Sequence, residues 1–306
     1  MNKADELKIL NKIYGNQTDL KIQDHEQPDF IMSTNQLQFG VEIVEFYDSE
    51  TSARLKHIPT YHDELLDRKN FRNGDEKVLK VDKIKFYKNS EFVFEDIAII
   101  SRPPTLRVIG QQFLKTLKTK NEKFKKYDES LKYINLIIYD TEENFKSIKQ
   151  ENFYSEFITP EIFKEIIGSP FNEVFLIANF SDGDFYLRLK AHILIARLYL
   201  YNNFIVTKYS LKAEVMATKI FSLLRLSGFD ERLKLDNELN LHYAGLQFII
   251  KDHDEGLKIL IDERRMLPIL EHKLTPNLNI DNSTAEIEDF LNNNTFTSSL
   301  GFPLIN

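Results

Sequence analysis

The chain has 306 residues, 42% hydrophobic and 28% charged, with a formal net charge of −7 and no cysteine. This composition supports a sizeable folded core, excludes disulfides, thiolate zinc sites and cysteine nucleophiles, and argues against a nucleic-acid partner unless basic residues are clustered. The start has no long apolar signal segment and no apolar run reaches membrane-spanning length, so we expect a soluble cytoplasmic protein with no membrane partner.

The predicted elements alternate between helices and strands. In chain order, the patterns predict a helix over 4–14, extended segments at 19–22 and 28–33, a strand over 38–47, mixed short elements over 50–105, a helix over 107–127, a strand over 133–140, a helix over 160–167 and a strand over 172–180. Residues 185–201 predict either a strand that runs into a helix or one long helix, residues 212–227 predict a helix, and short helices and strands alternate beyond about 230. This order favours an α/β layered core. We therefore predict one domain over 1–205, with an insertion at about 50–105, and a mostly helical accessory or assembly region over 206–306.

Basic residues are concentrated in one part of the sequence. Residues 50–126 carry 18 Lys and Arg against 11 Asp and Glu, whereas the rest of the chain is acidic. Such a region can steer a phosphate backbone to one face of a protein. The alternative is an ordinary solvated surface with uneven charge.

Two carboxylates stand next to or inside apolar strands near the N-terminus. Asp29 follows Pro28 at the start of an extended segment, and Glu42 lies among small and apolar neighbours in FGVEIVEFY. A short turn would bring both acids side by side, where they repel unless a cation lies between them. A divalent ion such as Mg²⁺ prefers such oxygen ligands. The alternatives are an ordinary Pro-Asp turn and a glutamate that faces water.

Lys120 occupies the apolar stripe of the helix predicted over 107–127. The other members of this stripe are Phe113, Leu117, Phe124 and Tyr127. A lysine in this position extends to solvent, pairs with an acid or serves chemistry. On the first helix, Glu6 lines up with apolar residues in the same way; its alternative role is a first-turn acid stabilised by the helix dipole.

An acid on a first helix, then Pro-Asp, then a strand with an embedded acid, then a helix with lysine resembles the PD-(D/E)XK nuclease superfamily. The motif residues are Pro28-Asp29 and Glu42 in GVEIVE, and KTKNEKFKKYDESLKYINLIIYD is similar to the lysine-bearing helix and following strand of uncharacterised bacterial members. The resemblance covers about residues 1–200 and implies a restriction-endonuclease-like mixed central sheet flanked by helices. Val44 departs from it, because the superfamily usually has lysine two residues after the acid; Lys120 is the candidate replacement.

The resemblance implies a metal-dependent endonuclease that hydrolyses nucleic acid in bacterial restriction or anti-phage defence; DNA is favoured as the substrate, and RNA stays open. Asp29 and Glu42 would hold Mg²⁺ or Mn²⁺, with Glu6 completing the metal shell, and Lys120 would orient water or stabilise transition-state charge. The predicted phosphate contacts are Arg54, Lys56, Arg68, Lys69 and Arg72. Because the sequence has no Gly-rich phosphate loop, an ATPase, helicase or other defence subunit is a predicted partner, as is a second copy of the chain.

Two other functions stay open on the sequence alone. A nuclease-like fold with Val44 in place of the usual lysine would bind nucleic acid or a protein partner without cutting. A structural subunit would use residues 206–306 for assembly.

Overall fold

The chain divides into two units, and each is described by itself. The computed structural model describes residues 1–250 except 17, 18, 36, 68–70, 73, 102, 128, 209–212, 230, 231, 244 and 245, and the backbone of 257–260; for 77, 199, 200, 202–208, 213, 214 and 250 it describes the backbone alone. The first unit combines residues 1–46 with the chain from residue 114 onward. The second unit is the inserted segment Tyr47–Phe113, whose bounds lie near the insertion expected at about 50–105.

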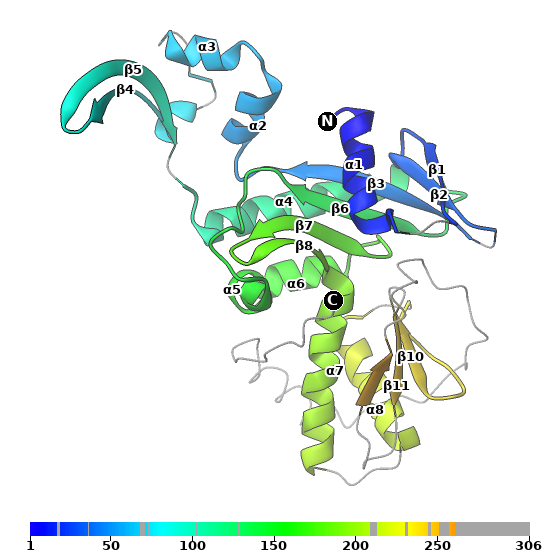
Figure 1. Cartoon of the computed structure of the whole chain (residues 1–306). Helices are drawn as coiled ribbons and strands as arrows, with labels where there is room; N and C mark the ends of the chain where they lie inside the picture. The colour runs from blue at the N-terminus through cyan, green and yellow to red at the C-terminus, as the bar shows by residue number, and fades with distance from the viewer. Residues whose placement is uncertain are drawn as a thin grey trace. The chain divides into compact units, whose positions relative to one another are not determined.

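A six-stranded mixed sheet forms the centre of the first unit (Figure 1). Its strands, in spatial order, are β1 (Lys21–Asp24), β2 (Phe30–Ser33), β3 (Gln38–Phe46), β6 (Ile134–Asp140), β7 (Val174–Phe180) and β8 (Gly183–Arg188). The first three strands are antiparallel, β6 and β7 continue parallel to β3, and β8 is antiparallel to β7. β6 and β7 are nearly continuous apolar runs because central parallel strands are buried on both faces.

Helices flank this sheet, which confirms the prediction of a mixed α/β protein. They are α1 (Lys3–Tyr14), α4 (Leu106–Lys123) with the short η2 (Phe124–Lys126), η3 (Gln150–Asn152), α5 (Phe153–Phe157) and α6 (Pro160–Ile167). α1 is capped by the Asn2 side chain and packs Ile9, Leu10 and Ile13 into the cluster that contains Val41 and Ile43 of β3. Strand alternation points Glu42 to the opposite face, where it meets α4.

The C-terminal part of the first unit is mixed rather than mostly helical where it is described. Two helices, α7 (Leu189–Lys208) and α8 (Ala213–Leu226), precede an antiparallel sheet of β9 (Lys234–Leu235), β10 (Asn240–Tyr243), β11 (Leu246–Ile250) and β12 (Leu257–Leu260). Arg232 ties this part to the connection between α6 and β7, because its guanidinium donates hydrogen bonds to the carbonyl oxygens of Ser169 and Phe171. The helical prediction for residues 261–306 lies outside the described residues.

Within the described ranges, no helix is both long enough and apolar enough to cross a membrane.

The described residues of the inserted unit form two complete helices, a short 3-10 turn, a β-hairpin and the first part of α4. These are α2 (Glu50–His57), α3 (Tyr61–Leu66), η1 (Asp75–Lys77), β4 (Leu79–Lys88) and β5 (Glu91–Ser101). Its small core consists of Tyr61, Leu65 and Leu79, with Leu55, Ile58, Val81 and Ile99 packed around them. The helices therefore hold the base of the hairpin, at the end where β4 begins and β5 ends.

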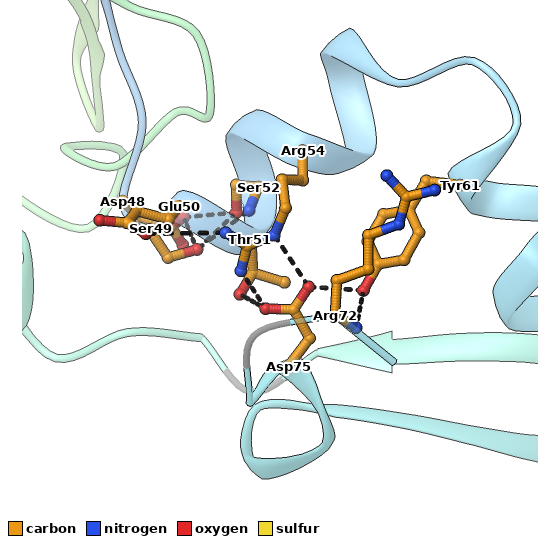
Figure 2. A network of polar contacts seen from close by, with 9 residues as sticks. All are labelled: Asp48, Ser49, Glu50, Thr51, Ser52, Arg54, Tyr61, Arg72 and Asp75. Atoms are coloured by element: carbon orange, nitrogen blue, oxygen red, sulfur yellow. Dashed lines mark hydrogen bonds and ion pairs between the residues drawn. The ribbon is translucent and has the colours of Figure 1, made fainter. Parts of the chain in front are cut away.

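The carboxylate of Asp75 fastens this unit together (Figure 2). Its oxygens accept hydrogen bonds from the hydroxyl of Thr51 at 2.7 Å, the hydroxyl of Tyr61 at 2.5 Å and the guanidinium of Arg54. Burial disfavours the charged form of Asp75, but these donors outweigh it and lower its pKa. Asp75 thus joins both helices to the turn that precedes β4.

Candidate active site

The pairing register of β2 and β3 brings Asp29 and Glu42 together. β2 pairs Phe30 with Val41 of β3, so Asp29, one residue before β2, lies across from Glu42. The Asp29 carboxylate then reaches over β3 and accepts a 2.7 Å hydrogen bond from the backbone N–H of Ile43. The two acids are therefore neighbours because of strand register, although they are far apart in sequence.

Gly40 allows the chain before Asp29 to approach β3 closely. A Cβ atom at position 40 would lie 2.5 Å from Cγ of Pro28, well inside van der Waals contact, and 3.2 Å from Ile134. Only glycine leaves this space. Gly40 therefore makes room for Pro28, and Glu42, two residues later on the same strand, lies across from Asp29.

Lys120 of α4 reaches the strand acid, which is one of the three outcomes that its place in the apolar stripe left open. Its ammonium lies 2.5 Å from Oε1 of Glu42, and the two side chains are only 16% and 9% exposed. Leu117, one turn before Lys120, is fully buried, so packing fixes the lysine-bearing face of α4 toward the sheet. The result is a partly buried ion pair between residues 78 positions apart in the sequence.

The electrostatic environment of Asp29 disfavours its charge. Burial raises the pKa of Asp29 to about 6, and the negative charge of Glu42 adds to this rise. The hydrogen bond from the Ile43 N–H and the charge of Lys3 act in the opposite direction without cancelling it. Asp29 therefore carries negative charge at neutral pH that its surroundings compensate only in part.

Lys3 links Glu6 to the turn that carries Asp29. Its ammonium donates to the carbonyl oxygens of His25 and Asp29, each at 2.9 Å, and lies 3.0 Å from the Glu6 carboxylate. It also lies 3.7 Å from the Asp29 carboxylate. Sequence reasoning missed Lys3; the signal was its i,i+3 spacing to Glu6, which places both side chains on one helix face.

Tyr127 is a second residue that sequence reasoning missed, because it was counted only as an apolar stripe member. Its side chain is buried, and burial together with the nearby charge of Glu42 raises the pKa of its hydroxyl far above the usual value. That hydroxyl has no hydrogen-bond partner of regular geometry in the described part of the chain. The phenol thus lies beside the acidic pair and stays protonated.

The Asp29–Glu42 pair has the donor chemistry of a divalent-cation site. Hard cations such as Mg²⁺ accept one or two carboxylates and take water or phosphate oxygens for the rest. Burial, and after it the charge of Glu42, raises the pKa of Asp29, and a bound cation would favour the charged form against both. Among the described residues, no group of three His, Asp or Glu side chains that could hold a metal is found. The charge of Glu6 nevertheless contributes to the raised pKa of Asp29, and both carboxylates lie near the Lys3 ammonium.

The predicted phosphate contacts lie in the inserted unit, where two of the arginines have intramolecular partners. The Arg54 guanidinium is bound to Asp75 and lies 3.6 Å from Glu50, and Arg72 lies 2.7 Å from Glu64. Lys56 places its ammonium 5.4 Å from the centre of the Tyr47 ring. Arg68 and Lys69 lie outside the described residues.

Comparison of the chain with models of protein families, with curated proteins and with solved structures finds no match. The description of this protein therefore rests on its own fold and on the geometry of the candidate site. It is a mixed α/β protein in which a half-buried aspartate lies beside a buried glutamate, and the glutamate pairs with a lysine from a flanking helix.

Proposed function

We propose that the chain is a metal-dependent nuclease that hydrolyses phosphodiester bonds. The observation that carries this proposal is the convergence of Asp29, Glu42 and Lys120 from a turn, a strand and a helix. The element order also agrees with the resemblance: a first helix, three antiparallel strands, a lysine-bearing helix and a strand parallel to β3. Lys120 supplies the ammonium that Val44, at the usual lysine position, lacks.

Each residue has a distinct part in the proposed reaction. A bound Mg²⁺ or Mn²⁺ would polarise the phosphate and lower the pKa of a coordinated water. Asp29 and Glu42 would hold that ion, with Asp29 kept in place by its hydrogen bond from Ile43. Lys120 would share its ammonium between Glu42 and a phosphate oxygen, which stabilises the charge that builds up in the transition state. Glu6 would act indirectly, by fixing Lys3 beside Asp29.

The lysine-bearing helix also supports a nucleic-acid substrate. The exposed lysines on α4 and η2 are Lys115, Lys118, Lys123, Lys125 and Lys126. Because they belong to the same helical segment as Lys120, they can neutralise backbone phosphates near the site without reading sequence. Following the resemblance, we favour DNA as the substrate and a role in restriction or anti-phage defence beside an ATPase or helicase.

A binding module without catalysis is the second candidate. The specific observation in its favour is the Glu42–Lys120 ion pair, in which the lysine already neutralises one of the two metal-ligand candidates. Such a protein would hold nucleic acid without cutting it.

The deciding experiment incubates the full chain with supercoiled and linear DNA and with RNA, in Mg²⁺, Mn²⁺ or EDTA. We expect metal-dependent cleavage that Asp29→Asn and Glu42→Gln each abolish. The matched control is Glu45→Gln, an acid on the same strand whose carboxylate lies 3.5 Å from the N-terminal amine; it should cut normally. Binding without cleavage by the wild-type chain in either metal would favour the binding module and refute the nuclease.

A further inference from the structure

Tyr127 lies directly after η2, at the end of the helical segment that carries Lys120. Only 8% of the residue is exposed, and its hydroxyl oxygen is buried from solvent. A ligand that arrives from solvent therefore does not reach this hydroxyl. The phenol acts only on the protein groups that lie beside it.

Packing fixes the place of the phenol ring. Its centre lies 5.8 Å from the ring centre of Phe124 and 5.9 Å from that of Phe171. Phe171 is fully buried, and its carbonyl oxygen accepts hydrogen bonds from the Lys190 ammonium at 2.6 Å and from the Arg232 guanidinium at 2.5 Å. The phenol is thus held by neighbours that are themselves fixed, as is usual for residues that position a functional group.

The group beside the phenol is the carboxylate of Glu42. Burial raises the pKa of Tyr127, and the charge of Glu42 and hydrogen bonding to its carboxylate add to this rise, so the phenol stays protonated and is available as a donor. Among the described residues, however, no acceptor meets this hydroxyl at regular hydrogen-bond geometry. A buried donor without a regular partner costs free energy, which a small shift of the neighbouring carboxylate recovers.

Binding of a divalent ion supplies the reason for such a shift. The Glu42 carboxylate now has the Lys120 ammonium 2.5 Å from its Oε1. A cation bound to Glu42 repels that ammonium, which weakens the hold of Lys120 on the carboxylate. Glu42 then needs another donor to keep its orientation, and the phenol of Tyr127 is the donor at hand.

We propose that Tyr127 is a positioning residue for Glu42: its hydroxyl donates a hydrogen bond to the Glu42 carboxylate when that carboxylate binds a divalent ion. The inference rests on the proposed function, in which Lys120 shares its ammonium with a phosphate oxygen. A neutral phenol orients the carboxylate and leaves it the negative charge that the cation needs, whereas an ammonium cancels that charge. Hydrogen bonds of this kind behind a metal ligand commonly set its affinity for the metal.

Titration calorimetry of the full chain with Mn²⁺, in the absence of nucleic acid, tests the inference. The binding event at the site is the one that Asp29→Asn removes. Tyr127→Phe keeps the ring and removes only the hydroxyl, and it should weaken this binding by about 10- to 100-fold. The matched control is Tyr201→Phe, at a fully buried tyrosine of α7 whose hydroxyl has no regular partner among the described residues either; it should bind Mn²⁺ as the wild type does.

Urea unfolding in EDTA separates positioning from a purely structural role. Without metal, Tyr127→Phe should be at least as stable as the wild-type chain, because it loses a donor that has no regular partner. A structural tyrosine would instead give a less stable variant with unchanged affinity for Mn²⁺. In the cleavage assay, saturating Mn²⁺ should restore most of the rate of Tyr127→Phe but not that of Lys120→Met.

The outcomes distinguish this inference from the proposed nuclease activity. Unchanged Mn²⁺ affinity in Tyr127→Phe overturns the role of Tyr127, and cleavage by the wild-type chain then still supports the nuclease. Weaker Mn²⁺ binding by Tyr127→Phe supports its role even if the wild-type chain binds Mn²⁺ without cutting, which refutes the nuclease alone. A wild-type chain that binds no Mn²⁺ overturns both.

Discussion

Two carboxylates, one in each unit, have opposite electrostatic environments. Asp75 in the inserted unit accepts hydrogen bonds from Arg54, Tyr61 and Thr51, and these donors lower its pKa despite burial (Figure 2). Asp29 in the first unit accepts one backbone N–H bond and lies beside Glu42; burial and that neighbouring charge raise its pKa to about 6. Both side chains are held in place, but only Asp75 has its charge satisfied.

The difference separates a structural acid from a candidate functional acid. An acid surrounded by donors stabilises the fold and has little capacity left for a ligand. An acid held next to another acid destabilises the fold at neutral pH and gains from any bound cation. The number and sign of the partners, rather than burial alone, therefore distinguish the two roles.

The largest expected effect comes from breaking the lysine contact in the candidate site. Lys120→Met should lower the cleavage rate by about 10²- to 10³-fold, because it removes the ammonium expected to stabilise the transition state. The check is a single-turnover assay with plasmid in Mn²⁺. Lys118→Met, which changes an exposed lysine on the same helix, should leave the rate within about twofold. Equal losses in both variants would assign Lys120 to general phosphate attraction.

Replacing the structural acid Asp75 should reduce the stability of the inserted unit rather than the cleavage rate. Asp75→Asn leaves Arg54 with only the more distant and exposed Glu50 carboxylate and should destabilise the inserted unit by about 3 kcal/mol. Because the folded-state pKa of Asp75 is lowered, its stabilisation is present above the ordinary aspartate pKa of 3.8 and is lost as the pH falls below it. Hydrogen exchange of α2 and α3 measures the effect. Asp63→Asn, at an 84% exposed side chain of α3, is the control; comparable loss of protection there would contradict the role of Asp75.

The smallest expected effect on stability is a gain rather than a loss. Asp29→Asn should stabilise the chain by about 1 to 2 kcal/mol at pH 7.5 in EDTA, after allowance for partial solvent screening. The pKa of Asp29 is raised from 3.8 to about 6, so the wild-type chain loses stability as the pH rises through this window, and the variant does not. The gain should vanish below about pH 4.

Urea unfolding at several pH values measures this gain, and added Mn²⁺ should stabilise the wild-type chain but not Asp29→Asn. A destabilised Asn variant at pH 7.5 would mean that Asp29, like Asp75, is a structural acid.

Much of the fold could be predicted because it follows from local patterns. The 3.6-residue period of α1 and α4 and the apolar runs of β3, β6 and β7 are visible in the sequence, and the helix start at Thr159-Pro160 is a local capping signal. The mixed C-terminal part was harder to predict, because short half-buried strands such as β9 and β10 have too few residues for a clear period.

The site was only partly visible for a related reason. Lys120 could be found because a lysine interrupts an apolar stripe, and Glu42 because an acid interrupts an apolar strand. Lys3 and Tyr127 could not, since one resembles a surface charge and the other a core aromatic. Arg54 and Arg72 were predicted as phosphate contacts from their charge. The sequence does not show that Asp75 and Glu64 pair with them in the folded chain.

The sequence by itself determined which residue types interrupt the apolar pattern, because hydrophobic periodicity is a local property of the chain. Tertiary structure alone decided which of them meet. Strand register set Asp29 across from Glu42, and helix packing brought Lys120 onto that pair. The same long-range packing surrounded Asp75 with donors and left Asp29 beside another acid, since pKa shifts depend on neighbours in space rather than in sequence.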